Sequence, residues 1–183
     1  LPKRVQGVLE VIAVAGDPVP LRVVMDAVGG DAAPAEWITR LRSEHLVRQD
    51  GRSPEDDVNT YHDRIRESVI GGMAPKRRGE IHGWLAEAMQ RFDPERVDFL
   101  AKHWQAAGEP AKALQYLVAV AERAARQLAF ERAAELFGQA AELETDPQAR
   151  SGLWESLGAA YANLGRLQDA AEAYLQAAEE AEE

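Results

Sequence analysis

The spacing of apolar residues predicts that this chain is built mainly of helices. In its first part, three segments repeat apolar residues at positions i, i+3, i+4 and i+7, which is the spacing of one helical face. Glycine and proline then interrupt the first two runs, as they do where helices end. We expect these helices at residues 1–16, 21–28 and 34–45.

The hydrophobic period changes after the third of these helices. Residues 46–49 and 58–61 are short and compatible with strands, and Asp50-Gly51 between them is a turn signal. We expect the two strands to pair as a hairpin with a long, open loop. Three short helices followed by a hairpin are typical of a winged-helix arrangement, so the sequence predicts a winged-helix-like domain over residues 1–74.

From the end of the hairpin onward the pattern is helical without interruption by strands. Gly71-Gly72 and Pro75 end one helix, and the Asp93-Pro94 pair begins another, because proline is tolerated in a first turn. The predicted helices cover residues 62–73, 76–90, 93–104, 110–126, 129–143, 148–164 and 167–182. We expect residues 75–109 to form a connecting helical hairpin and residues 110–183 to form a separate set of hairpins.

The C-terminal part of the sequence repeats itself after 37 residues. The shift aligns residues of compatible size: Leu117 with Trp154, Ala121 with Gly158, Ala133 with Ala170, Phe137 with Tyr174 and Ala140 with Ala177. Small residues let two helices approach closely, and large residues fill the space between neighbouring hairpins. The repeat therefore predicts stacked hairpins.

The second copy carries a known pattern. Trp154-x2-Leu157-Gly158-x2-Tyr161-x3-Gly165-x4-Ala170-x3-Tyr174-x2-Ala177 resembles the tetratricopeptide repeat consensus, and residues 114–143 resemble a degenerate copy. The resemblance implies an α-solenoid that binds a protein or peptide in a concave groove. The residues at groove positions are Gln115, Val118, Glu122 and Arg126 in the first copy, and Glu155, Ala159, Ala162 and Asn163 in the second.

A second resemblance covers most of the chain. The segment Tyr61-His62-Asp63-Arg64-Ile65-Arg66-Glu67, with Arg78-x3-His82 and Leu100-Ala101-x-His103-Trp104, is similar to the region that follows the ATPase module in bacterial STAND-class signalling ATPases. This resemblance implies a non-catalytic regulatory segment of a larger ATPase or ATPase-linked kinase. It further implies contact with an upstream nucleotide-binding module, which is the only place where ATP is expected. No phosphate-binding loop occurs in this sequence.

The distribution of charge opposes a nucleic-acid role for the second half. Residues 93–183 hold 8 Lys/Arg against 17 Asp/Glu, whereas residues 1–92 hold 13 against 14. An acidic surface repels phosphate. The alternative hypothesis is therefore a transcription regulator that binds DNA through its first half. Its reading residues would be Arg40 and Arg42 on the third helix, with Arg48 and Arg52 beside the hairpin. Acidic residues share these surfaces, so binding of nucleic acid is not expected.

The remaining chemistry is sparse. Four histidines lie about twenty residues apart without a second ligand at i+3 or i+4, so no metal site is predicted. No nucleophile accompanies a base, so no catalytic residue is assigned. The sequence has no cysteine and no apolar run long enough to span a membrane, and we expect a cytoplasmic location. Because it begins at Leu1 and ends inside a helical pattern, we expect a piece of a longer protein.

Overall fold

The computed structural model describes residues 1–29, 35–51 and 53–182. Within these residues the chain forms ten helices and three short strands, which confirms the predicted mainly helical fold. Two compact units are present: residues 1–95 with 106–108, and residues 96–105 with 109–183. The division of the chain at residues 74 and 109 stays a prediction from sequence.

The first unit is organised around its first helix. Helix α1 (Lys3–Ala15) buries residues on nearly all its sides, among them Val8, Val11 and Ile12, and a helix that is apolar all round belongs inside a core. It packs against the other helices of this unit. These are α2 (Leu21–Ala27), α3 (Ala35–Ser43), α4 (Asp63–Gly71) and α5 (Pro75–Phe92).

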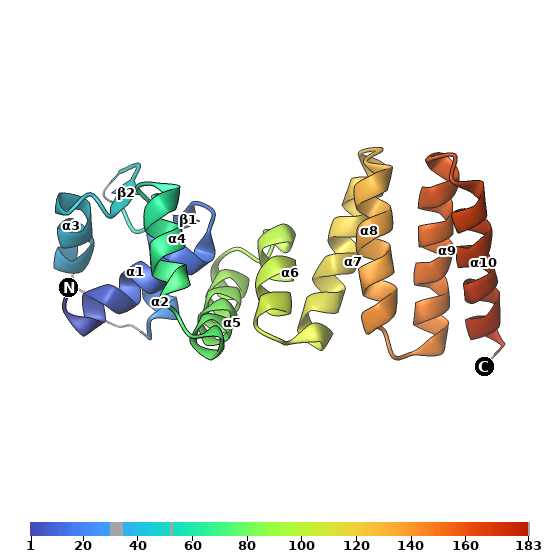
Figure 1. Ribbon diagram of the computed structural model, residues 1–183, viewed down its shortest axis with the longest axis horizontal. Helices are drawn as coiled ribbons and strands as arrows, with labels where there is room; N and C mark the ends of the chain where they lie inside the picture. Colours follow the sequence, from blue (N-terminus) through green and yellow to red (C-terminus); the bar gives the residue numbers. More distant parts are fainter. Residues whose placement is uncertain (30–34, 52, 183) are drawn as a thin grey trace. The chain divides into compact units, whose positions relative to one another are not determined.

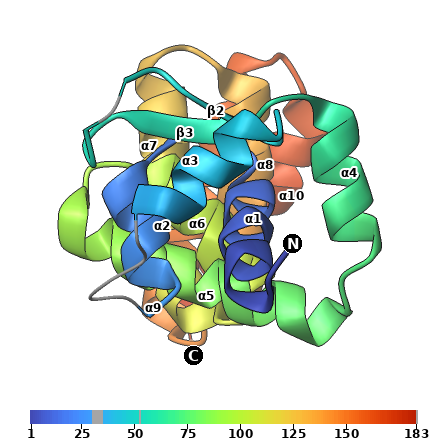
Figure 2. The same cartoon turned by 90° about the vertical axis from the view of Figure 1, so that its left-hand side faces the viewer.

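A small antiparallel sheet covers part of this core. Strands β1 (Val19–Pro20), β2 (Val47–Gln49) and β3 (Asp57–Thr60) lie in the order β1-β3-β2. Figure 2 shows β2 and β3 beside α1 and α3. The pairing of β2 with β3 confirms the predicted hairpin. Strand β1 was not predicted, because a two-residue strand that contains a proline carries no alternating pattern.

Specific polar contacts fix the helices of the first unit. Arg77 Nε lies 3.3 Å from Glu10 Oε2 and joins α5 to α1. Arg91 Nη2 lies 2.5 Å from Asp26 Oδ2 and joins α5 to α2. The Leu21 amide donates to the Asp56 carbonyl at 3.1 Å, so the loop between β2 and β3 is held to the start of α2.

The second unit repeats its own geometry. It contains α6 (Val97–Ala106), α7 (Pro110–Arg126), α8 (Phe130–Leu143), α9 (Pro147–Asn163) and α10 (Leu167–Ala181). The last residue of α6, Ala106, is grouped with the first unit. Helices α7 and α9 begin and end 37 residues apart, which is the period found in the sequence. From α7 onward each helix packs on the next, and Figure 1 shows that the successive helices run in alternating directions.

The turns inside the two hairpins are equivalent at the level of the backbone. The Ala129 amide donates to the Ala124 carbonyl at 2.9 Å, and its counterpart Arg166 donates to Tyr161 at 3.0 Å. Both turns need a left-handed residue, which is Gly165 (φ 72°) in one and Leu128 (φ 61°) in the other. Glycine adopts this conformation without a steric penalty, whereas leucine does not.

We therefore expect Leu128→Gly to raise the free energy of unfolding by about 0.5–1 kcal/mol, because the relief of strain exceeds the entropy cost of glycine. The exposed leucine side chain contributes few contacts that would be lost. The reverse substitution, Gly165→Leu, lowers stability by about 1 kcal/mol. Urea denaturation followed by circular dichroism measures both changes. A loss of stability in Leu128→Gly would contradict the equivalence of the two turns.

Small residues line the interface between α9 and α10. Ala170, Ala173 and Ala177 are buried, and Gly158 lies against the ring of Tyr174. The Ser151 hydroxyl donates to the Ala177 carbonyl at 2.8 Å. At the same end of the interface, Arg150 Nη2 lies 2.5 Å from Glu180 Oε2 and ties the start of α9 to the end of α10.

Two glycines of α9 give a matched test of this packing. A Cβ added at Gly158 would meet the Tyr174 ring at 2.9 Å, whereas one added at Gly152 would meet nothing within 4 Å. Alanine is favoured over glycine in a helix by about 1 kcal/mol, so Gly152→Ala should stabilise the protein by roughly that amount. Gly158→Ala should instead lower stability by about 1 kcal/mol, because overpacking outweighs the helix preference. Equal effects of the two substitutions in urea denaturation would show that α9 and α10 are not closely packed.

Candidate interaction surfaces

The groove residues predicted in the first hairpin share one face of α7. Gln115, Val118, Glu122 and Arg126 follow one another at steps of three or four residues, which places them on the same side of the helix. All are exposed except Val118, which is half-buried. Arg126 Nη1 lies 3.6 Å from Glu122 Oε2. This face therefore combines one apolar side chain with an exposed ion pair.

The groove residues predicted in the second hairpin lie on α9 and are all exposed. Glu155, Ala159, Ala162 and Asn163 leave the surface nearly flat, because two of the four are alanines. The Asn163 side-chain amide donates to the Ala159 carbonyl at 2.8 Å, so its orientation is fixed. Helix α8 packs against both α7 and α9, and all three belong to the second unit. The predicted groove residues of α7 and of α9 therefore lie at exposed or half-buried positions of their own helix.

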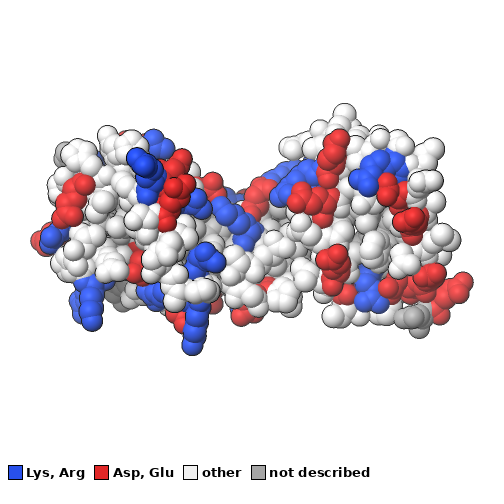
Figure 3. Space-filling model, in the orientation of Figure 1, with Lys and Arg blue, Asp and Glu red and all other residues white. Residues whose placement is uncertain are grey.

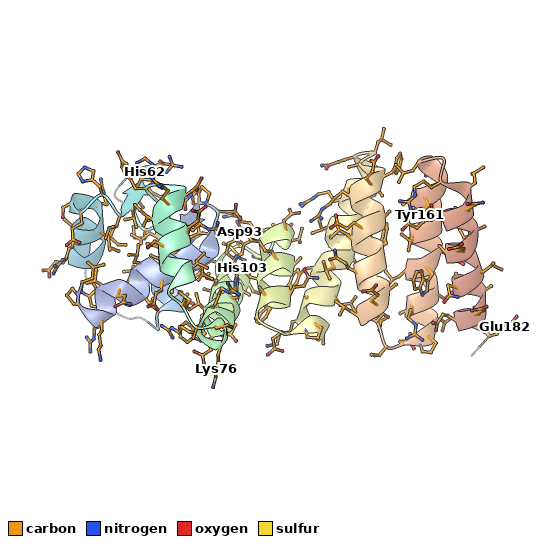
Figure 4. All side chains as sticks on the ribbon, in the orientation of Figure 1. His62, Lys76, Asp93, His103, Tyr161 and Glu182 are labelled. Atoms are coloured by element: carbon orange, nitrogen blue, oxygen red, sulfur yellow. The ribbon has the colours of Figure 1, made fainter. Side chains whose placement is uncertain are left out.

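A surface pocket of about 500 Å³ lies between α9 and α10. Trp154, Leu157 and Tyr161 contribute from α9, and Figure 4 labels Tyr161 in this region. The lining residues from α10 are Asp169, Glu172, Ala173, Leu175, Gln176 and Glu179. From sequence, the three α9 residues were expected to fill space between hairpins. Only Leu157 is buried, whereas Trp154 and Tyr161 are half-buried.

The edge of this pocket is acidic. Arg166 Nε donates to Asp169 Oδ2 at 2.7 Å, and this hydrogen bond raises the pKa of the Arg166 guanidinium above its ordinary value. The same guanidinium lies 4.5 Å from the centroid of the Tyr161 ring. Farther along α10, Glu172 and Glu179 are exposed. This edge was not predicted from the sequence, although the absence of Lys and Arg from residues 167–182 is a signal that points to it.

The arginines proposed for DNA reading do not form one free basic surface. Arg40 Nε on α3 is paired with Glu44 Oε1 at 2.9 Å. Arg42 Nη1 donates to the Gly51 carbonyl at 3.5 Å, and Arg48 is exposed on β2. The fourth residue, Arg52, lies outside the described residues. Partial neutralisation of this helix weakens the electrostatic attraction to phosphate on which DNA binding depends.

The histidines are distributed over separate elements. His62 precedes α4, whereas His103 is buried in α6 and stacks on Phe99 with ring centroids 4.0 Å apart (Figure 4). Across the described residues, no three His, Asp or Glu side chains are grouped so that they could hold a metal ion. In the same part of the chain, none of the helices combines the length and the apolar character needed to cross a bilayer.

Comparison with known proteins gives no family assignment. No family model matches the sequence, and no curated protein is significantly similar to it. The function must therefore be inferred from the residues and their geometry.

We expect no specific retardation of mixed genomic DNA fragments by the full chain in a gel shift at low salt. The reason is the pairing of Arg40 with Glu44, together with the net charge of −10. The double substitution of Arg40→Ala and Arg42→Ala should leave the gel pattern unchanged. Binding that disappears in this variant would support the transcription-regulator hypothesis instead.

Proposed function

We propose that this chain is a non-catalytic regulatory and protein-interaction segment of a larger bacterial signal-transduction ATPase or ATPase-linked kinase. The observation that carries the proposal is the pair of hairpins repeated at 37 residues, whose first helices present exposed side chains at all the groove positions except the half-buried Val118. The proposed architecture is a winged-helix-like domain followed by tetratricopeptide-like hairpins.

The chemistry of the groove positions favours a protein or peptide as the partner. Ala159 and Ala162 are small, so the backbone of a bound segment can approach α9 closely. Glu155 and Asn163 beside them offer polar groups that can pair with main-chain or side-chain donors. The set lacks the paired Lys and Asn residues that clamp a terminal carboxylate, so we propose an internal segment of a partner rather than a free C-terminus.

The first unit has a different part in this proposal. Its order of elements is α1-β1-α2-α3-β2-β3, a compact helical core with a small antiparallel sheet. That order is compatible with a winged-helix-like domain, and the resemblance to signalling ATPases assigns such a domain to contact with the nucleotide-binding module. We propose that this unit transmits the state of that module to the hairpins, while ATP is bound outside the present sequence.

We expect Ala159→Arg to reduce partner capture at least fivefold, because a long charged side chain would occupy the groove position of α9. The full chain, the variant and the control Ala181→Arg are each immobilised and exposed to native bacterial lysate. Captured proteins are then compared by quantitative mass spectrometry. Both substitutions are at exposed helical alanines, so neither should change stability by more than about 0.5 kcal/mol.

Two outcomes decide between the alternatives. Proteins that are retained by the wild type and by Ala181→Arg, but lost with Ala159→Arg, would support a groove on α7 and α9. Identical sets of captured proteins for all three chains would contradict it.

A further inference from the structure

A second surface pocket, of about 500 Å³, lies in the first unit between α2 and the second half of α5. The two helices pack against each other, and Figures 1 and 2 show them side by side. This volume is in the range of pockets that hold small molecules. The lining includes Asp26, Ala27 and Val28 from the end of α2, and Trp84, Glu87 and Arg91 from α5.

The wall formed by α5 presents three different chemical groups in a row. Trp84, Glu87 and Arg91 follow one another at steps of three and four residues, which places them on the same side of the helix. Trp84 is half-buried, whereas Glu87 and Arg91 are exposed. A ligand on this wall therefore meets an indole ring, a carboxylate and a guanidinium.

The carboxylate of Glu87 is left without a partner. A glutamate four residues before an arginine is favourably placed for an ion pair within a helix. Here Arg91 Nη2 instead lies 2.5 Å from Asp26 Oδ2 on α2, and Arg91 Nε donates to the main-chain carbonyl of Glu87 at 3.3 Å. Within the part of the chain that the structure describes, nothing pairs with the Glu87 carboxylate. Two carboxylates and one guanidinium give the pocket a net charge of −1.

The ring of Trp84 is held in place by a residue that does not line the pocket. Arg77 Cζ lies 4.7 Å from the centroid of the ring, and Arg77 Nε is fixed in turn by Glu10 Oε2 at 3.3 Å. A side chain that is already oriented loses little conformational freedom when a ligand binds. Together with Ala27 and Val28, the ring gives the pocket an apolar part beside its unpaired carboxylate.

The charge of the ligand is selected by the pocket itself and not by the surface around it. Residues 1–92 hold 13 Lys/Arg and 14 Asp/Glu, and acidic and basic side chains of this unit are interspersed on the face shown in Figure 3. An unpaired carboxylate beside an aromatic ring favours one positive charge on an apolar body. A Ca²⁺ ion needs several oxygen ligands, and a polyamine needs further unpaired carboxylates.

Among organic cations, a guanidinium matches these groups better than an ammonium does. It is planar, it forms two parallel hydrogen bonds with a carboxylate, it stacks on aromatic rings and it is more weakly hydrated. We propose that this pocket binds a guanidinium group, which pairs with Glu87 beside the ring of Trp84. A small molecule or an arginine side chain of a partner supplies the group. The site lies in the first unit and does not depend on the groove proposed on α7 and α9.

The test titrates the full 183-residue chain with n-butylguanidinium at constant ionic strength and follows the indole N–H signal of Trp84 by nuclear magnetic resonance. The chain has four tryptophans, and Trp84→Phe identifies the signal of this residue. We expect a saturable shift with a dissociation constant of about 1–10 mM, in keeping with so small a ligand. n-Butylurea has the same shape without the charge and should give no saturable shift. No saturable shift with n-butylguanidinium, or an equal response to n-butylurea, overturns the proposal.

Two matched variants locate the bound cation. Glu87→Gln keeps the shape of the side chain and should weaken the binding of n-butylguanidinium by about fivefold or more, because the charged pair is lost. Glu67→Gln removes an exposed carboxylate from α4, outside the pocket, and should leave binding unchanged. Both positions are exposed, so neither substitution should disturb the fold. Equal binding by wild type and Glu87→Gln overturns the proposal.

A capped peptide, acetyl-Gly-Arg-Gly-amide, distinguishes the two sources of the guanidinium. Binding of this peptide that is lost with Glu87→Gln supports the proposal with an arginine of a partner as the source. Binding of n-butylguanidinium that is lost with Glu87→Gln, without binding of the peptide, supports it with a small molecule as the source, because the main chain then does not fit.

Discussion

The second unit depends on the close approach of helices through small side chains. Gly158, Ala170, Ala173 and Ala177 allow α9 and α10 to pack, and the larger Tyr174 rests against Gly158. Protein interiors are closely packed, so one extra methyl group at such a position changes the stability of the protein. Because each helix from α7 onward packs on the next along the chain, the unit grows by addition and leaves long helix faces accessible. The exposed faces of α7 and α9, which carry the predicted groove positions, are a consequence of this order of packing.

The first unit is packed differently, because its other helices surround one central helix, α1. The buried apolar residues of α1 lie on more than one side of the helix. Helices α2, α3, α4 and α5 and strand β3 all pack against it. Its ion pairs, such as Arg77 with Glu10, lie at the edges of this core and fix the angles of helices that apolar contact alone would leave free to slide.

The helices were largely predictable from sequence, because glycine, proline and the apolar period act locally. The pair Asp146-Pro147 illustrates this: Asp146 Oδ2 accepts from the Ala149 amide at 3.0 Å and begins α9 one residue from the predicted start. Strand β1 was not predictable, because its pairing with β3 comes from tertiary structure and not from its two residues. The partial exposure of Trp154 and Tyr161 was not predicted from the sequence either. Periodicity assigns a residue to a face, but only the neighbouring helix decides whether that face is covered.

The ion pair of Arg150 with Glu180 has a consequence for recognition. It anchors the last turn of α10 to the first turn of α9, at the place where the end of a helix would otherwise fray. The Arg150 guanidinium also donates to the Glu144 carbonyl at 3.3 Å, so the loop before α9 helps to fix the position of the ion pair. A partner that binds on α9 or α10 would therefore meet a surface that is already ordered, which leaves more of the contact free energy to appear as affinity.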